Sequence, residues 1–550
     1  IQCLMYSDKE NVNILTSLLV NHGVNKAIVC PGSRNAPIVH NLNECLDIQC
    51  YPVTDERSAG FYALGMAQAT DSPVVVCVTS GTALLNLLPA VAEAFYQHIP
   101  LIVVSADRPA QWINQLDGQT IPQNGALNSF VKKSINIPEF HDEEERWYCN
   151  RMINDALISC ACGICGPVHI NVPITEPLYE FTKTKLPVER KIEFVSASVD
   201  TTRARTLMLD RFKHASRPMI VIGQCHLNSL NERLSMYLKS NVVVLIEPLS
   251  AGGDQQYMDE IVRCVENDER YFPDFILYIG DCIVSKSIKK FLRKVARTAE
   301  VWMAREDGKI ADTLMNAVGV IEGNVSELLD NVKFDKSEEY YHLWHDSAEV
   351  KNIVQRCRSF VPEYSQMYAV KSFEEAISHH DVIRHYANSM SVRLGCIYSK
   401  GYMYVNRGIN GIEGSLSTAA GYSLASDRDV YCVIGDLSFF YDQNALWNRN
   451  IGGNLRILLL NNGGGAIFEK FEGLKDSNAR DNLVMAKHDT SAVGICSANH
   501  INYIVASNAE ELKAGLDKFI NMKSDSPTVL EVFTDAENDM NVIKEYYTKI

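Results

Sequence analysis

The C-terminal third of the chain places an acidic residue and an amide after two successive strand-like apolar runs. Asp436, in the segment Gly435-Asp436-Leu437-Ser438, follows the first run, and Asn462 follows the second, 26 positions later. Because the carboxyl ends of parallel strands meet at one edge of a sheet, we expect both side chains in one crevice. A carboxylate, an amide oxygen and a backbone carbonyl suit Mg²⁺, and the glycines at 463–465 let the backbone approach a diphosphate closely. The pattern predicts a site for a diphosphate and a divalent metal.

A second acidic residue, Glu56, is a candidate for proton transfer. It lies in Asp55-Glu56-Arg57-Ser58, which opens a helical run rich in Ala and Gly that extends to Thr70. A carboxylate at a helix start is favoured by the helix dipole, so a solvated surface residue is the simplest interpretation. Beside a diphosphate site, however, the same carboxylate becomes a candidate general acid or base.

Arginines occur in several of the loops that are expected to follow strands. They are Arg34, Arg108, Arg393 and Arg407, in a chain whose 52 basic and 67 acidic residues give a net charge of −15. A guanidinium presents a planar fork that matches a carboxylate, whereas an isolated surface ion pair contributes under about 1 kcal/mol. We interpret the group as a binding set for substrates that carry carboxylates.

The elements that would position these residues form three α/β blocks. Apolar, β-branched runs alternate with helical patterns, which is typical of parallel sheets covered on both faces. The first block contains the runs Lys26–Cys30, Val74–Thr79 and Leu101–Ser105, with one helix expected over 82–97. The second contains Met219–Gly223, Val242–Ile246, Phe275–Gly280 and Val301–Ala304, and the third contains Val430–Ile434, Arg456–Leu460 and Thr528–Phe533. We predict three doubly wound parallel-sheet domains in series, over residues 1–182, 183–345 and 346–550.

The amino-acid composition favours a globular protein and argues against several other classes. The 550 residues are 46% apolar and 22% charged, which is typical of a globular protein. The negative net charge argues against a nucleic-acid partner, and no apolar run is long enough to span a membrane. The start, Ile1–Glu10, lacks a leader pattern, so the sixteen cysteines favour reduced thiols and a cytoplasmic protein. Cys160, Cys162 and Cys165 are interpreted as structural thiols, and His98, His169, His379 and His380 as structural histidines.

The Gly-Asp segment followed by Asn461-Asn462 resembles the signature of the thiamine-diphosphate-dependent enzymes. Their pyrimidine-binding, central and diphosphate-binding domains match the order of the three blocks. The resemblance implies that Asp436, Asn462 and the Gly464 carbonyl bind Mg²⁺, or Mn²⁺ in its place. It implies that Glu56 shares a proton with the aminopyrimidine of the cofactor, which promotes ionisation of its thiazolium carbon. The further cofactor contacts that it implies are Thr82, Ile412, Gly435, Leu437, Ser438 and Ile467.

Four stretches are similar to one family within this group, the 2-succinyl-5-enolpyruvyl-6-hydroxy-3-cyclohexene-1-carboxylate synthases of menaquinone biosynthesis. They are Cys30–Pro37, Thr79–Ala83, Ser105–Pro109 and Asn406–Gly414. These transferases decarboxylate 2-oxoglutarate and add the resulting succinyl-semialdehyde carbanion equivalent to isochorismate. By this resemblance Ser33, Arg34 and Gln119 join Glu56 as catalytic residues, and the implied substrate-binding residues are Arg108, Lys286, Ser389, Arg393, Arg407, Ile467 and Phe468. The chain departs from the family at Ser287, where an Arg is common, and at Gly118 and Ala466, where some relatives carry amides.

Other functions remain open at this point. Another thiamine-dependent 2-oxoacid decarboxylase or carboligase, such as an acetohydroxyacid synthase, would leave the dense arginine set without carboxylate partners. A dehydrogenase would need a Gly-x-Gly-x-x-Gly fingerprint, which the glycine-rich segments do not match. A non-catalytic thiamine-fold protein would be indicated by loss of Glu56 or Asp436, and both are present. The resemblance further implies that these two residues meet across a subunit interface, in a homodimer or a dimer of dimers.

Overall fold

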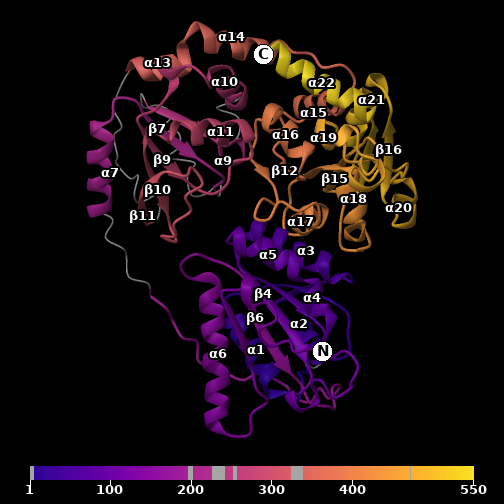
Figure 1. Ribbon diagram of the computed structural model, residues 1–550. Coiled ribbons are helices and arrows are strands. Elements are labelled where there is room, and N and C mark those ends of the chain that lie inside the picture. The colour runs from indigo at the N-terminus through magenta and orange to yellow at the C-terminus, as the bar shows by residue number, and fades with distance from the viewer. Residues whose placement is uncertain (1–4, 196–201, 226–241, 252–256, 324–337, 471) are drawn as a thin grey trace.

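The computed structural model describes residues 5–195, 202–225, 242–251, 257–323, 338–470 and 472–550. Within these ranges the chain forms three entirely parallel sheets of six, five and six strands, each covered by helices (Figure 1). The prediction of three doubly wound α/β domains is therefore confirmed. None of the helices in the described ranges is long and apolar enough to cross a bilayer.

The first sheet has the strand order β2-β1-β3-β4-β6-β5. Its strands are β1 (Lys26–Val29), β2 (Gln49–Pro52), β3 (Val74–Val78), β4 (Leu101–Asp107), β5 (Lys133–Asn136) and β6 (Val168–Pro173). Its helices are α1 (Glu10–Asn21), α2 (Ala36–Glu44), α3 (Glu56–Thr70), α4 (Thr82–Asn86), α5 (Leu88–Tyr96) and α6 (Glu143–Ala161). One face of the sheet packs on α1, α2 and α6, and the other packs on α3, α4 and α5. This second face is turned toward the third domain (Figure 1).

The single helix expected over residues 82–97 is wrong. Two helices occupy this segment, because α4 ends at Asn86 and α5 begins at Leu88. Pro89 is the second residue of α5. A proline has no N–H to donate and its ring clashes with the preceding turn, so it is tolerated at a helix start and interrupts a continuous helix.

The central sheet has the strand order β11-β10-β9-β7-β8. Its strands are β7 (Pro218–Ile222), β8 (Val243–Ile246), β9 (Phe275–Ile279), β10 (Glu300–Arg305) and β11 (Ala317–Glu322). Its helices include α7 (Thr202–His214), α9 (Pro248–Ala251), α10 (Met258–Val265) and α11 (Lys286–Val295). Two further helices, α13 (Glu338–Asp346) and α14 (Ala348–Ser359), lead into the third domain (Figure 1).

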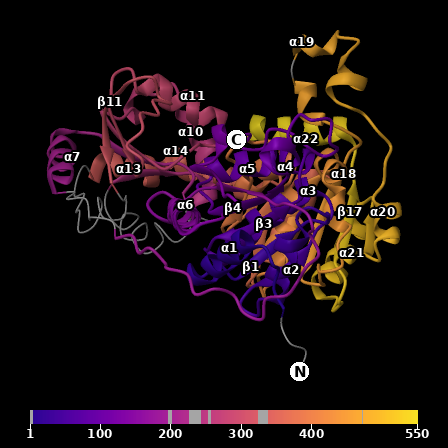
Figure 2. The ribbon, with the colours of Figure 1, turned by 90° about the horizontal axis from the view of Figure 1, so that it is seen from below.

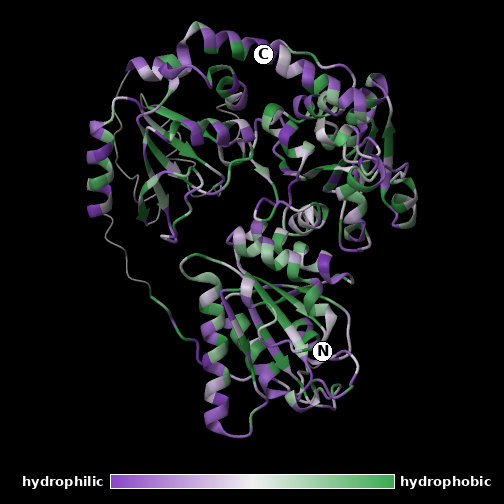
Figure 3. Cartoon of the chain, viewed as in Figure 1, coloured by the Kyte–Doolittle hydropathy of each residue, from purple (hydrophilic) through white to green (hydrophobic). Residues whose placement is uncertain are grey.

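The third sheet has the strand order β13-β12-β14-β15-β17-β16, which repeats the pattern of the first sheet. Its strands are β12 (Ile383–Tyr386), β13 (Met403–Tyr404), β14 (Val430–Gly435), β15 (Leu455–Asn461), β16 (Asn502–Ala506) and β17 (Thr528–Phe533). Its helices include α15 (Gln366–Ala376), α16 (Met390–Tyr398), α17 (Ser415–Ser423), α18 (Asp436–Tyr441), α20 (Val493–Ala498), α21 (Ala509–Asn521) and α22 (Ala536–Lys549). Figure 3 shows that apolar residues dominate the strands, in agreement with their burial.

The third domain shares a hydrophobic core with each of the other two. Helices α3 and α17 pack directly on each other (Figure 1). Apolar residues of the first and third domains form one core around them. Seen from below, the first domain lies in front of the third (Figure 2). A Cβ on Gly65 would lie 1.9 Å from the Thr418 carbonyl oxygen, and one on Gly421 would lie 2.1 Å from that of Tyr62. Only glycine permits this helix contact. A second core joins the central domain to α15, α16 and α22 of the third domain.

Candidate cofactor and substrate site

Asp436 lies at the carboxyl end of β14, as predicted, and is the first residue of α18. Its Oδ1 accepts a hydrogen bond from the backbone N–H of Leu437 (2.6 Å). Its Oδ2 accepts from the backbone N–H groups of Asn462 (3.1 Å) and Gly464 (3.0 Å) at the end of β15. Burial raises the pKa of Asp436, and these three N–H groups oppose the shift. The carboxylate therefore joins two adjacent strand ends and keeps oxygen lone pairs for a cation.

Asn462 is oriented by Asp539, in the first turn of α22. Its Nδ2 donates to Asp539 Oδ2 (2.8 Å), and Asp539 also accepts from Thr534 Oγ1 and from the backbone N–H of Gln366. Burial raises the pKa of Asp539 to about 6. Because the amide nitrogen is committed to Asp539, the amide oxygen remains available to a ligand.

The loop after β15 brings the backbone of Gly464 beside Asp436, because its N–H donates to Asp436 Oδ2. Gly463 and Gly464 have φ values of 74° and 148°, which residues with a side chain rarely adopt. No three His, Cys, Asp or Glu side chains gather as metal ligands in the part of the chain that the structure describes. A cation here would therefore depend on mixed oxygen ligands, namely Asp436, the Asn462 amide and the Gly464 carbonyl, which is the ligand chemistry that Mg²⁺ prefers.

One histidine, which the sequence analysis did not single out, faces this site. His488 Nε2 lies 3.6 Å from Asp436 Oδ2, and its ring packs edge-on against Phe440. It follows the glycine-rich turn by more than twenty residues in a loop without periodic pattern. Its proximity to Asp436 depends on tertiary folding, so no local signal in the sequence could have found it.

Glu56 begins α3 and is half-buried. Its Oε2 accepts a hydrogen bond from Asn86 Nδ2 (3.1 Å), while the preceding Asp55 caps the helix at Ser58 N–H. Neighbouring contacts tie this helix start to the third domain, because Asn444 Nδ2 donates to Asp55 Oδ2 (2.7 Å). Glu56 therefore belongs to the first domain but lies at its contact with the third.

The two predicted site arginines of the first domain have acidic partners. Arg34 is buried, with Nη1 donating to the Ile174 carbonyl (3.0 Å) and Nη2 paired with Glu176 (2.9 Å). Arg108 Nη1 lies 3.4 Å from Asp117 Oδ2, and its Nε is buried without a hydrogen-bond acceptor. A substrate carboxylate that binds either arginine would share the guanidinium with its acidic partner or would displace that partner.

Arg407 is held in a loop that the first and third domains position together. Its Nη1 donates to Asn388 Oδ1 (3.2 Å), and its Nε is buried without an acceptor. Asn388 Nδ2 donates to the carbonyls of Asn406 and Gly411, which secures both ends of the loop. The carboxylate of Glu93 accepts from the N–H groups of residues 408 (2.6 Å) and 409 (2.7 Å). Asn388 and Glu93 were not predicted.

The other predicted residues are distributed around these groups. Ser33, Thr82, Gln119, Lys286 and Ser389 are exposed, whereas Arg393, Leu437, Ile467 and Phe468 are half-buried and Ser438 is buried. Gln119 lies against Gly81, because a Cβ there would lie 3.2 Å from the Gln119 backbone. Ile412 is 44% exposed despite its large apolar side chain. Its side chain is an apolar surface, in the same loop as Arg407, that a ligand could cover.

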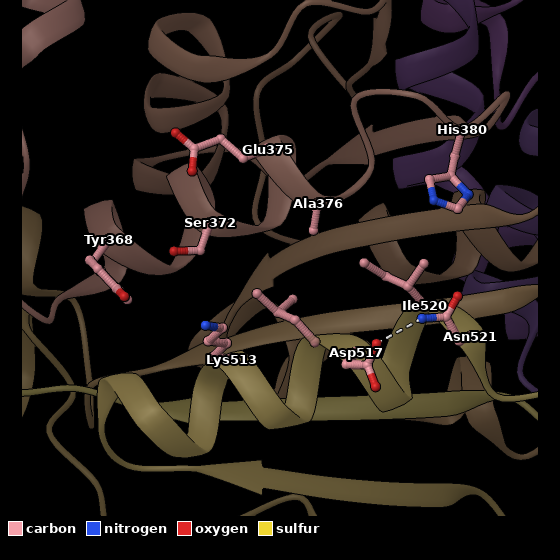
Figure 4. A pocket seen from close by; sticks show the side chains of 10 residues that line it. Tyr368, Ser372, Glu375, Ala376, His380, Lys513, Asp517, Ile520 and Asn521 are labelled. Carbon is pink, nitrogen blue, oxygen red and sulfur yellow. Dashed lines mark hydrogen bonds between the residues drawn. The ribbon is translucent and has the colours of Figure 1, made fainter.

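A groove of about 370 Å³ lies away from all of these residues, between α15 and α21 (Figure 4). Glu375, His380, Lys513 and Asp517 are among its lining residues, and Asn521 Nδ2 donates to Asp517 Oδ1 (3.0 Å). None of the predicted site residues lines it. The groove therefore does not belong to the strand-end site.

Comparison with known proteins agrees with the geometry at both ends of the chain. Residues 10–128 match the family model described as "Thiamine pyrophosphate enzyme, N-terminal TPP binding domain". Residues 388–532 match "Thiamine pyrophosphate enzyme, C-terminal TPP binding domain". Glu56 lies in the first of these domains, and Asp436 and Asn462 lie in the second.

Three relatives that match this chain over almost their whole length have the same name. A protein of Bacteroides fragilis is 42% identical over 99% of this chain and 100% of its own length, and one of Phocaeicola vulgatus is 42% identical over 99% of each chain. A protein of Porphyromonas gingivalis is 34% identical over 99% of this chain and 98% of its own. All three are named 2-succinyl-5-enolpyruvyl-6-hydroxy-3-cyclohexene-1-carboxylate synthase. The chain is therefore a thiamine-diphosphate enzyme and belongs to the 2-succinyl-5-enolpyruvyl-6-hydroxy-3-cyclohexene-1-carboxylate synthase family.

Proposed function

We propose that this chain condenses 2-oxoglutarate with isochorismate, as a transferase. One molecule of 2-oxoglutarate loses CO₂, and the remaining four-carbon unit forms a carbon–carbon bond to isochorismate. The product is 2-succinyl-5-enolpyruvyl-6-hydroxy-3-cyclohexene-1-carboxylate. The similarity to synthases of this name over 99% of the chain is the observation that carries the proposal.

The residues at the ends of β14 and β15 fit the diphosphate and metal of thiamine diphosphate. We propose that Asp436, the Asn462 amide and the Gly464 carbonyl hold Mg²⁺, which Mn²⁺ can replace. Gly435, Leu437, Ser438 and Ile467 border the diphosphate, and Thr82 and Ile412 contact the rest of the cofactor. When bound, thiamine diphosphate supplies a carbon nucleophile for the keto carbonyl and accepts the electron pair that CO₂ leaves behind.

The residues of the chain supply proton transfer and charge. Glu56, half-buried with one donor on its carboxylate, exchanges a proton with the aminopyrimidine ring of the cofactor. The substrate carboxylates bind to Arg34, Arg108, Lys286, Arg393 and Arg407, with Ser33, Gln119 and Ser389 as hydrogen-bonding partners. Ile467 and Phe468 form an apolar wall that keeps water from the reacting carbon.

The active unit in this proposal is a homodimer or a dimer of dimers. Large apolar side chains are exposed beside the start of α3, namely Leu85 (41%), Tyr441 (50%) and Trp447 (61%). A second copy of the chain that covers them would bring Glu56 of one chain to Asp436 and Asn462 of the other. We further propose domain limits of 1–182, 183–345 and 346–550, and a cytoplasmic site of action.

One assay tests substrates, cofactor and reaction together. The purified protein is incubated with thiamine diphosphate, Mg²⁺, 2-oxoglutarate and isochorismate, each omitted in turn, and products are followed by mass spectrometry. We expect product only when all four are present. Consumption of 2-oxoglutarate without isochorismate would instead indicate a different 2-oxoacid decarboxylase or carboligase. Bound cofactor without any turnover would indicate a non-catalytic protein.

A further inference from the structure

His488 is held in a fixed position beside the predicted metal ligands. It lies in the loop between the short helix Arg480–Val484 and α20, and its backbone N–H donates to the Gly463 carbonyl (2.9 Å). Its ring packs edge-on against Phe440, with 5.4 Å between the ring centres. The side chain is only 16% exposed. The glycine-rich turn and α18 together therefore set the direction of the imidazole.

The hydrogen bonds of His488 define which nitrogen carries the proton. The backbone N–H of Thr490 donates to Nδ1 (3.1 Å), so Nδ1 acts as an acceptor and the proton is on Nε2. This Nε2–H is buried and has no hydrogen-bond partner. Asp436 Oδ2, at 3.6 Å, is too distant and already accepts two backbone N–H groups.

A buried donor without an acceptor is costly in a folded protein, so an orphaned N–H aimed into a candidate site points to a missing acceptor. The neighbours of His488 define that acceptor. Asp436, Asn462 and Gly464 offer oxygens to a cation, and a donor among them complements an anion bound to the same cation. His488 is itself excluded as a metal ligand, because its Nε2 has a proton in place of a lone pair.

We propose that His488 donates its Nε2–H to the diphosphate group of the cofactor, alongside the metal ion. The inference rests on the cofactor site of the proposed function and adds a contact to it. The imidazole is a neutral donor here, since its Nδ1 is occupied by the Thr490 N–H. A neutral donor binds a phosphate oxygen and does not repel a cation a few ångströms away. A lysine or an arginine at this position would repel that cation.

Two substitutions test the Nε2–H donor of His488 separately from the other contacts of its side chain. In His488→Asn the amide oxygen can still accept the Thr490 N–H, but no donor reaches the position of Nε2. In His488→Gln the longer side chain can place an amide N–H near that position. His379→Phe, on the exposed surface that follows α15, is the matched control.

Binding is measured by calorimetry on the full-length protein, with thiamine diphosphate and separately with inorganic pyrophosphate, both at saturating Mg²⁺. We expect H488N to weaken both ligands at least tenfold, as for loss of one hydrogen bond to a charged group. We expect H488Q to recover most of this loss and H379F to bind like the parent chain. Unchanged melting of the ligand-free variants would exclude a folding defect, and H488F replaces H488N if that variant does not fold.

Three results would overturn the proposed contact or the cofactor site on which it rests. Unchanged affinity of H488N or H488F for both ligands would overturn the contact. Mn²⁺ affinity in the absence of any phosphate is measured by electron paramagnetic resonance. An equal loss of this affinity would show that His488 acts through Asp436, and it would also overturn the proposed contact with the diphosphate. Failure of the parent chain to bind thiamine diphosphate or pyrophosphate would refute the cofactor site of the proposed function itself.

Discussion

At the scale of single residues, the two acids of the site occupy opposite environments. Asp436 is buried and accepts three backbone N–H groups, which hold its carboxylate rigidly at the strand ends. Glu56 is half-buried and accepts one side-chain hydrogen bond, from Asn86. A rigid carboxylate suits a metal, and a less constrained one suits proton exchange.

Replacing Glu56 by Gln tests this division of roles. The amide keeps the size of the side chain and its hydrogen bond to Asn86 but cannot exchange a proton. We expect thiamine diphosphate affinity to stay within about threefold and turnover to fall by about 10²-fold or more, the usual loss on removal of a general acid or base. Calorimetry and steady-state kinetics check the two parts, and full turnover would contradict the assigned role.

Local sequence predicts only part of the site at this scale. Asp436 and Asn462 could be paired because each directly follows a strand, and adjacent parallel strands bring their ends together. His488, Asn388 and Glu93 could not be found, since each reaches the site through contacts with distant segments. A histidine in an aperiodic loop carries no local sign of its neighbours in the fold.

At the scale of elements, a helix of the first domain holds a loop of the third. Glu93 on α5 is buried, and its two oxygens accept from the successive N–H groups of Gly408 and Ile409. A Cβ on Gly408 would lie 2.8 Å from the Glu93 carbonyl oxygen, so this glycine allows the close approach. The loop carries both Arg407 and Ile412, so Glu93 holds in place the segment to which we assign substrate and cofactor contacts.

We expect Glu93→Gln to loosen this loop. The amide keeps one acceptor oxygen and turns its NH₂ toward the second N–H, which removes one hydrogen bond and adds a repulsive contact. The KM of at least one carboxylate substrate should rise about tenfold, with a smaller change in kcat. Steady-state kinetics with each substrate varied measure this effect. The control is Glu375→Gln, at an exposed position of α15. An unchanged KM in both variants would contradict a role of Glu93 in holding the loop.

The packing of α3 on α17 predicts that alanine in place of a contact glycine lowers the free energy of unfolding, although helix propensity alone would raise it. Alanine in place of a helical glycine ordinarily stabilises a helix by about 1 kcal/mol. In Gly421→Ala the new Cβ would meet the backbone of Tyr62 at 2.1 Å, which no rotamer change can relieve. We expect a loss of at least 1–3 kcal/mol, the usual cost of overpacking. Gly494→Ala in α20, where nothing lies within 4 Å, should be neutral or stabilising, and urea unfolding compares the two.

The elements themselves were predictable where they are long and apolar. β3, β4, β14 and β15 are buried along almost their whole length, so their continuous apolar runs predicted them. β13 has two residues and β16 is an edge strand with half-exposed side chains, and neither has such a run. Their place in the sheet follows from pairing with a neighbouring strand, which a local pattern does not contain.

At the scale of the whole molecule, the central and third domains meet around a buried acid. Glu260 of α10 accepts a hydrogen bond from Tyr546 Oη of α22 (3.1 Å), and Arg263 lies over the Tyr547 ring. Burial, assisted by the nearby charge of Asp259, raises the pKa of Glu260 from 4.5 to about 7. The folded chain therefore binds this proton more tightly than the unfolded chain does.

This difference predicts how stability depends on pH. Because the pKa of Glu260 is higher in the folded state, its contribution to the free energy of unfolding falls as pH rises from 4.5 to 7, by about 3 kcal/mol. Glu260→Gln keeps an acceptor for Tyr546 and removes the titration. The variant should gain stability relative to the parent chain as pH rises through this window. Urea unfolding at pH 5 to 8 checks this, and parallel pH profiles of the two proteins would contradict it.

The common strand order of the two outer sheets has a historical meaning. β2-β1-β3-β4-β6-β5 and β13-β12-β14-β15-β17-β16 are the same sequence of positions, and α3 and α17 follow the corresponding strands β2 and β13. Gly65 and Gly421 lie in these equivalent helices and make reciprocal contacts. A repeat of this kind is the pattern that duplication of one gene would leave. The two outer domains meet within one chain as two copies of a unit meet across a two-fold interface, with each glycine admitting the backbone of the other helix.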